Sequence, residues 1–281
     1  MVRRCFHFKS EKELFLGEKT LIMGILNITP DSFSDGGDFF SIEKAKEQVR
    51  KMLSDGADII DIGAESTRPG AKAISLTEEI ERLRPVLAEI VNMIDVPISI
   101  DTYKAEVADF ALKCGVDIIN DIWGLQYVDE PMKMAEVAAK YNAPVIVMHN
   151  TELMADSVDV IAAEKDFFRK SFTIAKQKKI PTENLILDPG IGFGKNTIQN
   201  LELVRRLREL KEIDGKEYPM LLGVSLKRFI GDVLDLPVNE RLEGTLAANA
   251  IGIKNGADIV RVHDVKETVR MAKIVDAIEN S

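Results

Sequence analysis

Polar and charged side chains stand at the ends of eight short apolar runs in this sequence, and they are the residues that could do chemistry. In chain order they are Asn27, Asp61 with Glu65, Asp101, Asn120 with Asp121, His149, Asp188, Ser225 with Lys227, and Arg261 with His263. Taken singly, each of them could equally be a residue that forms a turn or caps a helix and has no part in chemistry. Together they combine carboxylate and amide acceptors with cationic donors, and buried ionisable groups are costly unless they are paired or used. The pattern therefore predicts one polar binding or catalytic site.

Three loops beside these ends are rich in glycine and proline. Residues 27–37 read Asn-Ile-Thr-Pro-Asp-Ser-Phe-Ser-Asp-Gly-Gly. That length favours a lid over a plain surface connection, because strand-to-helix loops are usually much shorter. Residues 63–70, Gly-Ala-Glu-Ser-Thr-Arg-Pro-Gly, form a second polar loop. Residues 188–195, Asp-Pro-Gly-Ile-Gly-Phe-Gly-Lys, contain glycines but lack the spacing of a phosphate-binding P-loop.

The apolar runs themselves have the length of β-strands. They span residues 21–28, 58–62, 97–100, 117–120, 144–148, 184–187, 220–224 and 258–262. Each is continuously apolar rather than alternating, which is typical of parallel strands covered on both faces. Residues 55–60, 114–119 and 255–260 share one pattern, in which a glycine ends a helix-like segment and an aspartate opens the apolar run. This internal similarity predicts a repeated helix-to-strand unit with a left-handed glycine at its turn.

Helical patterns fill the gaps between the runs. Ser41 is expected to cap one helix, since short polar side chains accept hydrogen bonds from the first turn. Ser75 and Glu78 have the spacing of a capping box for a second helix. Pro85 lies inside that second pattern, where it is expected to kink the helix or to move its start.

Eight alternating strands and helices predict a TIM (β/α)8 barrel. Residues 201–210 and 265–278 supply two further amphipathic helices of the series, and residues 1–20 are expected to form a lid or a short hairpin. The carboxyl ends of all eight strands would then meet at one mouth. An open doubly wound sheet is the alternative, although it would normally have fewer units at this length.

The composition is that of a folded enzyme. The chain has 281 residues, 46% hydrophobic and 30% charged, without a linker or low-complexity stretch, so we expect a single domain over residues 1–281. Its net charge of −9 argues against nucleic-acid binding. No apolar run is long enough to span a membrane, and the N-terminus lacks the apolar core of a secretory signal. Two cysteines, Cys5 and Cys114, fit a reduced cytoplasm.

Six segments together resemble one enzyme family. They are Asn27-Ile-Thr-Pro-Asp-Ser-Phe-Ser-Asp-Gly-Gly, Glu65-Ser-Thr-Arg-Pro-Gly, Ile98-Ser-Ile-Asp-Thr, Ile119-Asn-Asp-Ile, Leu187-Asp-Pro-Gly-Ile-Gly-Phe-Gly-Lys and Arg261-Val-His-Asp. In this order, from Leu21 onward, the chain is similar to the dihydropteroate synthases. The resemblance implies a TIM barrel of folate biosynthesis that joins 6-hydroxymethyl-7,8-dihydropterin pyrophosphate to 4-aminobenzoate. It also implies release of pyrophosphate with Mg²⁺ as a helper.

The resemblance assigns a set of side chains to the pterin. They are Asp101, Asn120, Ile122, Met148, Asp188, Lys227 and Arg261. The 2-amino group and N3–H of a pterin are two parallel donors, which Asp188 would accept in a bidentate fork. Asn120 both donates and accepts, so it suits a mixed ring edge. Lys227 matches the lysine that donates to the carbonyl and N5 side of the ring, and the planar cation of Arg261 could stack on it.

The remaining subsites follow from the same resemblance. The residues implied for 4-aminobenzoate are Thr67, Arg68, Pro69, Phe193, Ser225 and Arg228. Those implied for the diphosphate are Asn27, Arg68, Arg261 and His263. Local positive charge is needed in a protein of net charge −9, and Arg261 and His263 are two residues apart on one strand face. Asn27 is the implied Mg²⁺ ligand, since Mg²⁺ keeps several waters and takes few protein ligands.

The implied reaction is a dissociative substitution. Loss of pyrophosphate leaves a methylene cation that the pterin nitrogens delocalise, and Asp35 and Asp101 are expected to stabilise its charge. Lys227, Arg261 and His263 complete the implied catalytic set. The amine of 4-aminobenzoate is already nucleophilic, so no strong base is needed. Closure of the loop at 27–37 would exclude water.

One position departs from the family pattern. The family usually has Ser-Arg-Lys where this chain has Ser225-Leu226-Lys227. The missing arginine lowers the positive potential near the diphosphate, so Arg68, Arg228 and Arg261 are left to supply positive charge there. Two alternatives remain open: a pterin-binding methyltransferase acting on methyltetrahydrofolate, and a pterin-binding paralogue with little catalysis, which Leu226 alone supports. The resemblance further implies a homodimer formed through late helices and inhibition by sulfonamides, which mimic 4-aminobenzoate.

Overall fold

Eight parallel strands form the centre of the computed structural model, which describes residues 3–28, 37–66 and 72–281. They are β3 (Leu21–Asn27), β4 (Ile59–Gly63), β5 (Ile98–Asp101), β6 (Ile118–Asp121), β7 (Val145–Met148), β8 (Leu185–Asp188), β11 (Leu221–Leu222) and β12 (Ile259–Val262). Their order in the sheet is β11-β12-β3-β4-β5-β6-β7-β8, and a parallel bridge between Leu187 and Met220 joins β8 to β11. The predicted TIM barrel is therefore confirmed, with a strand in each of the eight predicted places.

The continuous apolar character of the strands has a direct explanation in the packing. Alternate residues of each strand point to opposite faces of the sheet. On β3 and β4, Ile22 and Ile60 pack outward into the core beneath the helices, whereas Met23 and Ile59 point into the barrel. Both faces exclude water, so apolar residues are favoured at successive positions.

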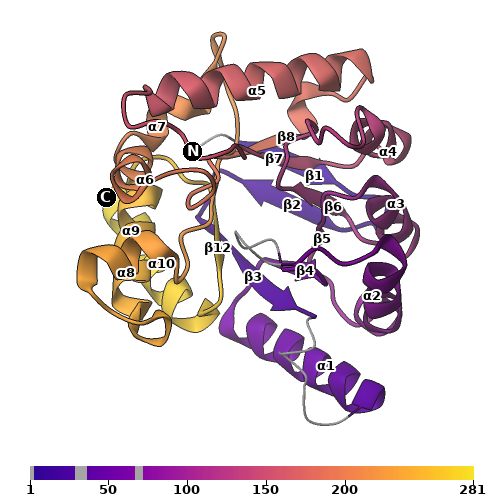
Figure 1. The fold of residues 1–281 in the computed structure, drawn as a ribbon. Coiled ribbons are helices and arrows are strands. Elements are labelled where there is room, and N and C mark those ends of the chain that lie inside the picture. Colours follow the sequence, from indigo (N-terminus) through magenta and orange to yellow (C-terminus); the bar gives the residue numbers. More distant parts are fainter. Residues whose placement is uncertain (1–2, 29–36, 67–71) are drawn as a thin grey trace.

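Helices cover the outside of the barrel on all sides (Figure 1). They are α1 (Gly37–Asp55), α2 (Leu76–Ile90), α3 (Ala105–Lys113), α4 (Lys133–Tyr141), α5 (Val160–Gln177), α6 (Thr197–Arg205), α7 (Leu207–Lys211), α8 (Arg228–Leu234), α9 (Leu242–Lys254) and α10 (Val265–Glu279). Two single 3₁₀ turns, η2 (Thr182–Asn184) and η3 (Val238–Glu240), precede β8 and α9. Within the described ranges, no helix is both long and apolar enough to cross a membrane.

Local signals predicted some helix boundaries and missed others. The Ser75 side chain accepts from the backbone N–H of Glu78 and caps α2, which is one half of the predicted capping box; the Glu78 carboxylate accepts from Arg82. Helix α2 continues through Pro85, so this proline does not set its start. The cap predicted at Ser41 is wrong, because α1 begins at Gly37. The segment at 201–210 is divided into α6 and α7 rather than forming one helix.

The N-terminal segment forms a hairpin at the amino-terminal end of the barrel. Strands β1 (Arg4–His7) and β2 (Glu13–Leu16) pair antiparallel. Phe6, Leu14 and Leu16 are buried against the first residues of the barrel strands. The hairpin prediction is thus correct, and the hairpin covers the end opposite to the carboxyl ends of the strands. The structure has a second small hairpin, β9 (Glu212–Ile213) with β10 (Lys216–Glu217), which was not predicted from the sequence.

The repeated helix-to-strand unit is built as the sequence predicted. Its three glycines have φ values of +101°, +102° and +109°, a region that favours glycine. The aspartate two residues later then accepts a backbone N–H at the start of the neighbouring strand. Asp58 accepts from Ile22 at 2.9 Å, Asp117 from Ile98 at 2.9 Å, and Asp258 from Met220 at 2.8 Å. The repeat therefore ties adjacent strands together below the mouth.

Candidate active site

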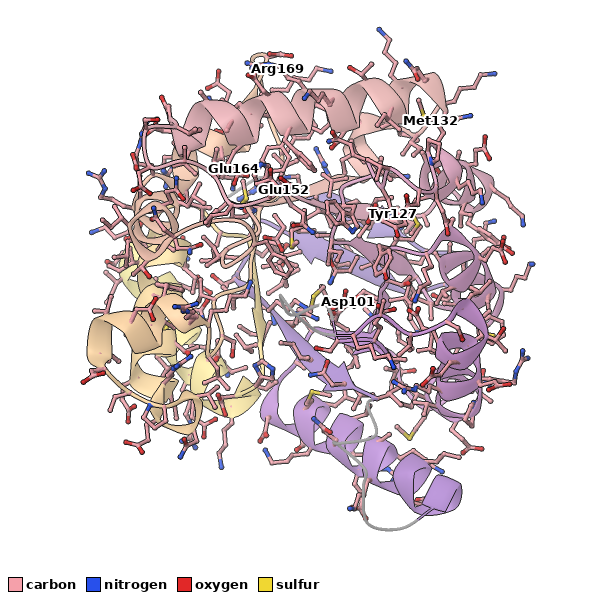
Figure 2. The ribbon with its side chains drawn as sticks, in the orientation of Figure 1. Asp101, Tyr127, Met132, Glu152, Glu164 and Arg169 are labelled. Carbon is pink, nitrogen blue, oxygen red and sulfur yellow. The ribbon has the colours of Figure 1, made fainter. Side chains whose placement is uncertain are left out.

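An arginine between two carboxylates lies at the centre of the barrel. Arg261 Nε donates to Asp61 Oδ2 at 2.6 Å, and its Nη2 donates to Asp101 Oδ2 at 2.7 Å. Asp61 is fully buried within β4, Asp101 ends β5, and Arg261 comes from β12. Three strands that are distant in sequence thus meet at one ion-pair group. Figure 2 shows Asp101 in the middle of the ring of strands.

Asn120 extends this group on the next strand. The parallel register places it beside Asp101, and its amide nitrogen lies 3.4 and 3.3 Å from the two carboxylate oxygens of Asp61. Asp61 also accepts from the Ser99 hydroxyl. Sequence reasoning placed Asp61 among the strand ends but gave it no role. A charged residue inside the otherwise apolar run Ile59–Gly63 was the signal that could have found it.

Two further charged residues, Asp188 at the end of β8 and Lys227 in the loop after β11, form a second group. Asp188 Oδ1 accepts from the backbone N–H of Gly190 at 2.8 Å, which orients the carboxylate at the end of β8. Lys227 Nζ donates to the Ile191 carbonyl and lies 4.9 Å from the centroid of the Phe193 ring. Phe193, expected beside 4-aminobenzoate, therefore also contacts Lys227, which is expected to bind the pterin.

The charges of these two groups act on one another. Burial raises the pKa of Asp101 to about 7; Arg261 opposes the rise and Asp61 adds to it. Burial also raises the pKa of Asp188, against the effect of Lys227 and Arg261. Burial lowers the pKa of Lys227 to about 8, while Asp188 raises it. Asp188 and Arg261 are therefore close enough for each charge to affect the pKa of the other, as expected of residues that share one site.

One buried oxygen has an unused acceptor capacity. Asp101 Oδ1 is buried and has no hydrogen-bond partner among the described residues. Such an atom is costly to leave unpaired in the interior. A ligand with an N–H donor at the barrel mouth would satisfy it. This unpaired acceptor indicates that the mouth can take a ligand with a hydrogen-bond donor.

The other predicted pterin and anion residues divide between the mouth and its surroundings. Met148 ends β7 and Ile122 follows β6, both buried. The Ser225 hydroxyl lies 2.9 Å from His263 Nδ1 and accepts the His263 backbone N–H, so these two predicted residues pair with each other. Arg228 is 90% exposed and lies 3.5 Å from Asp232 on its own helix, so the structure does not bring it to the central group.

Three strand-end residues do not join the central group. Both Asp121 oxygens accept backbone N–H groups, from Trp123 and Leu125, so Asp121 is a turn cap. Glu65 bonds to Tyr103 and Lys104. His149 bonds to Lys195 on the far side of the β8 loop. The expectation that all eight ends face one mouth is therefore only partly correct, because short polar side chains also serve the turns.

Four predicted residues lie outside the described ranges. They are Asp35, Thr67, Arg68 and Pro69. Their predicted roles in catalysis and in binding 4-aminobenzoate and diphosphate stay predictions.

The glycines after β8 have a packing role. A Cβ on Gly190 would lie 1.9 Å from the His149 carbonyl oxygen, and one on Gly194 would lie 2.3 Å from that of Thr151. Both have positive φ, of +59° and +63°. The loop is pressed against the segment after β7, which only glycine permits. Close backbone approach explains these glycines without a phosphate cradle.

Comparisons with known proteins agree on one family. A family model described as pterin binding enzyme matches residues 23–263. The dihydropteroate synthase of Bacillus subtilis is 52% identical, over 94% of this chain and 90% of that protein. A crystal structure of the Clostridium difficile dihydropteroate synthase in the presence of pteroic acid has a TM-score of 0.89 and 48% identity, over 95% of this chain and 99% of that one. The Xanthomonas albilineans dihydropteroate synthase with 4-aminobenzoic acid has a TM-score of 0.91 and 34% identity over all of both chains.

A TIM barrel with acidic, amide and cationic groups around one buried acceptor is the arrangement of a pterin-binding enzyme, and this chain belongs to that family. Identity of about one half over nearly the whole chain narrows the class further. Within the family the chain belongs to the dihydropteroate synthases, which are transferases of folate biosynthesis. The resemblance drawn from the six sequence segments is confirmed.

Proposed function

We propose that this protein condenses 6-hydroxymethyl-7,8-dihydropterin pyrophosphate with 4-aminobenzoate by a dissociative substitution. The bond from the pterin methylene carbon to the diphosphate oxygen breaks, and the oxygen leaves with the electron pair. The amine nitrogen then bonds to that carbon and loses a proton, which gives 7,8-dihydropteroate and pyrophosphate. The buried acceptor Asp101 Oδ1 is the observation that best supports a pterin at the mouth.

The pterin is proposed to lie between the two charged groups. Asp188 would accept the paired donors of the 2-amino group and N3–H. Because the Asn120 amide nitrogen is directed at Asp61, its carbonyl oxygen is the atom we expect to face the ring. Lys227 would donate to the ring carbonyl and N5 side, and Ile122 and Met148 would supply apolar contacts.

Arg261 is better suited to the pterin than to the diphosphate. Two of its nitrogens already donate to the carboxyl groups of Asp61 and Asp101, so these donors are not free for a diphosphate oxygen. The planar guanidinium can still stack on a flat ring. The anion-binding role is proposed to fall more on Arg68 and His263, with Asn27.

Asp101 is proposed to stabilise the methylene cation. As a carboxylate it would place negative charge beside the developing positive charge in a water-poor site. Asp35 is proposed to assist from the first loop. Ser225, Phe193, Thr67 and Pro69 would contact 4-aminobenzoate, and competition by sulfonamides for this subsite is expected.

The residues present fit a Mg²⁺ ion held mainly by the substrate. Asn27 ends β3 with a partly exposed side chain, and its amide oxygen is a hard ligand of the kind that Mg²⁺ takes. When bound, the ion would neutralise charge on the diphosphate. A different trio, Cys5, His7 and Glu13, lies within 4.8 Å on the N-terminal hairpin, at the opposite end of the barrel. It plays no part in the proposed reaction.

A homodimer in the cytoplasm is proposed as the working form. Ile251, Ile274 and Ile278 on α9 and α10 are at least half exposed, and exposed apolar side chains on late helices would suit a contact between copies. Sedimentation analysis at micromolar concentration would report the assembly state.

The proposed reaction is tested by pyrophosphate release that depends on 4-aminobenzoate. Stoichiometric release with formation of dihydropteroate is expected. Binding of the pterin without turnover would instead favour the catalytically weak paralogue. Transfer of a methyl group from methyltetrahydrofolate, with no pyrophosphate release, would favour the methyltransferase.

Replacing Asp188 tests the pterin fork. Asp188→Asn exchanges one acceptor for a donor, which would face the pterin donors, so we expect affinity for 6-hydroxymethylpterin to fall more than tenfold. Calorimetry measures the change. Unchanged affinity in a folded variant would refute the role of Asp188.

A further inference from the structure

A buried trio of titratable side chains lies beneath the β8 loop, outside the group described above. Lys195 is at the end of that loop, His149 follows β7, and Glu164 points inward from α5 (Figure 2). Lys195 Nζ lies 3.3 Å from Glu164 Oε1 and 2.8 Å from His149 Nδ1. None of the three has a part in the proposed chemistry.

The hydrogen bonds of Lys195 point toward the active-site loop. Its Nζ donates to the Gly190 carbonyl at 3.1 Å and to the Phe193 carbonyl at 3.0 Å. His149 Nδ1 lies 2.8 Å from the same Nζ and 3.1 Å from Glu164 Oε1. In the tautomer that leaves Nδ1 without a proton, Nδ1 accepts the third N–H of the ammonium. Lys195 therefore fixes both ends of the Gly190–Phe193 turn at once.

That turn carries much of the pterin site. The Gly190 N–H orients the Asp188 carboxylate, and the Ile191 carbonyl and Phe193 ring contact Lys227. His149 adds a second connection, because its backbone N–H donates to the Asp188 carbonyl at 3.0 Å. A shift of the turn would therefore move the groups that hold the pterin.

Glu164 supplies the charge that this arrangement needs. Its side chain is fully buried, and neither oxygen accepts a hydrogen bond from the residues that the structure describes. Burial raises the pKa of Glu164, and the Lys195 ammonium 3.3 Å away opposes this by favouring the ionised carboxylate. Burial lowers the pKa of Lys195, and Glu164 in turn opposes that. An ammonium at this depth is costly without such a counter-charge.

We propose that Lys195, with Glu164 as its counter-ion and His149 as third acceptor, is a positioning residue that holds the β8 loop in its pterin-binding conformation. The inference rests on the proposed function, since a pterin must be the ligand. It gives a role to the lysine that ends the glycine-rich segment, for which sequence analysis found none.

Lys195→Met tests the proposal against a matched control. Methionine keeps an unbranched side chain but donates no hydrogen bond. Lys211 is also buried, 2.7 Å from Asp258 at the other end of the barrel, so Lys211→Met removes a comparable ion pair away from the loop. Both variants are expected to lower Tm. Only Lys195→Met is expected to weaken 6-hydroxymethylpterin binding at least tenfold and to raise the KM for the pterin substrate more than it lowers kcat.

A double variant separates positioning from stability. Lys195→Met with Glu164→Leu leaves no unpaired carboxylate, so Tm is expected to recover toward the wild-type value while pterin affinity stays at least tenfold weak. The proposal is overturned if Lys195→Met binds the pterin within twofold of wild type, or if the double variant recovers affinity together with Tm. Should Lys195→Met fail to fold, the double variant decides. Wild-type protein that neither binds the pterin nor turns over would instead count against the proposed function.

Discussion

Asp101 has two different carboxylate oxygens in this structure, one paired with Arg261 and one buried without a partner. Its protonation decides what the mouth offers to a ligand. Burial raises its pKa to about 7, and burial lowers the pKa of Lys227 to about 8. The charged carboxylate and the charged ammonium therefore coexist best between these two values.

The pH dependence of kcat/KM should reflect both groups. The rate should rise with pH as Asp101 ionises near 7 and fall as Lys227 loses its proton near 8. Asp101→Asn should lose the acidic limb and most of the activity. An acidic limb that persists unchanged in Asp101→Asn would assign it to another group.

The same pKa has a consequence for stability. A carboxyl group whose pKa is higher in the folded state than in the unfolded chain binds its proton more tightly in the folded state, so protonation stabilises the fold. The contribution of Asp101 to the free energy of unfolding is fully present at pH values below about 4, the pKa of an aspartate in the unfolded chain. It is lost as pH rises from there through about 7.

Leu226 combines a strained backbone with the departure from the family pattern. Its φ is +58°, its N–H donates to Thr245 at 3.0 Å, and its carbonyl accepts from Arg241 at 3.1 Å. These two contacts hold a left-handed conformation that costs a residue with a Cβ about 1–2 kcal/mol. The Thr245 and Arg241 side chains thus hold the loop before Lys227 through the backbone of Leu226, independently of the side chain at position 226.

Leu226→Arg is therefore expected to be tolerated and to add positive charge near the diphosphate. The KM of the pterin pyrophosphate should fall severalfold. Leu226→Gly is the control, since it relieves the strain by about 1 kcal/mol without adding charge. Steady-state kinetics and thermal unfolding measure both effects, and equal KM values in the two variants would contradict the electrostatic explanation.

At the scale of elements, the repeated aspartates connect neighbouring strands below the mouth. Asp117 accepts from the first residue of β5 while it precedes β6, and Asp58 and Asp258 do the same for two other strand pairs. Local helix and strand patterns predicted the unit itself. The connection across strands needed the register, which local patterns do not contain.

Asp117→Ala should lower the free energy of unfolding by about 1–3 kcal/mol, because the buried N–H of Ile98 loses its acceptor. Asp117→Asn keeps an acceptor oxygen and should lose less. Denaturant unfolding compares the two. Pterin affinity should be unchanged in both variants, and a loss of affinity would show that this end of the barrel is coupled to the mouth.

At the scale of the whole molecule, the two ends of the barrel have separate tasks. The amino-terminal end is covered by the β1–β2 hairpin, whose Phe6, Leu14 and Leu16 contact the barrel interior. The carboxyl end holds the polar groups, among them Asp101 and Arg261. Stability and chemistry are thus placed at opposite ends, as in other barrels of this type.

Leu14→Ala tests this division. The cavity left at the covered end should lower the free energy of unfolding by about 2–5 kcal/mol. The kcat and KM values should stay within twofold of wild type below the unfolding transition. A large change in KM with unchanged Tm would mean that the hairpin affects the mouth directly.

The sequence by itself determined the eight strands, the barrel and most residues of the mouth. Periodicity and turn residues are local, and parallel strands bring their carboxyl ends together whatever the details. Only the tertiary structure decided the partners. Arg261 pairs with Asp61 and Asp101, which are 200 and 160 residues away in the sequence. Glu164 on α5 pairs with Lys195 in the loop after β8. Such contacts depend on barrel closure and side-chain direction, so no local pattern distinguishes the carboxylate that pairs from the one that caps a turn.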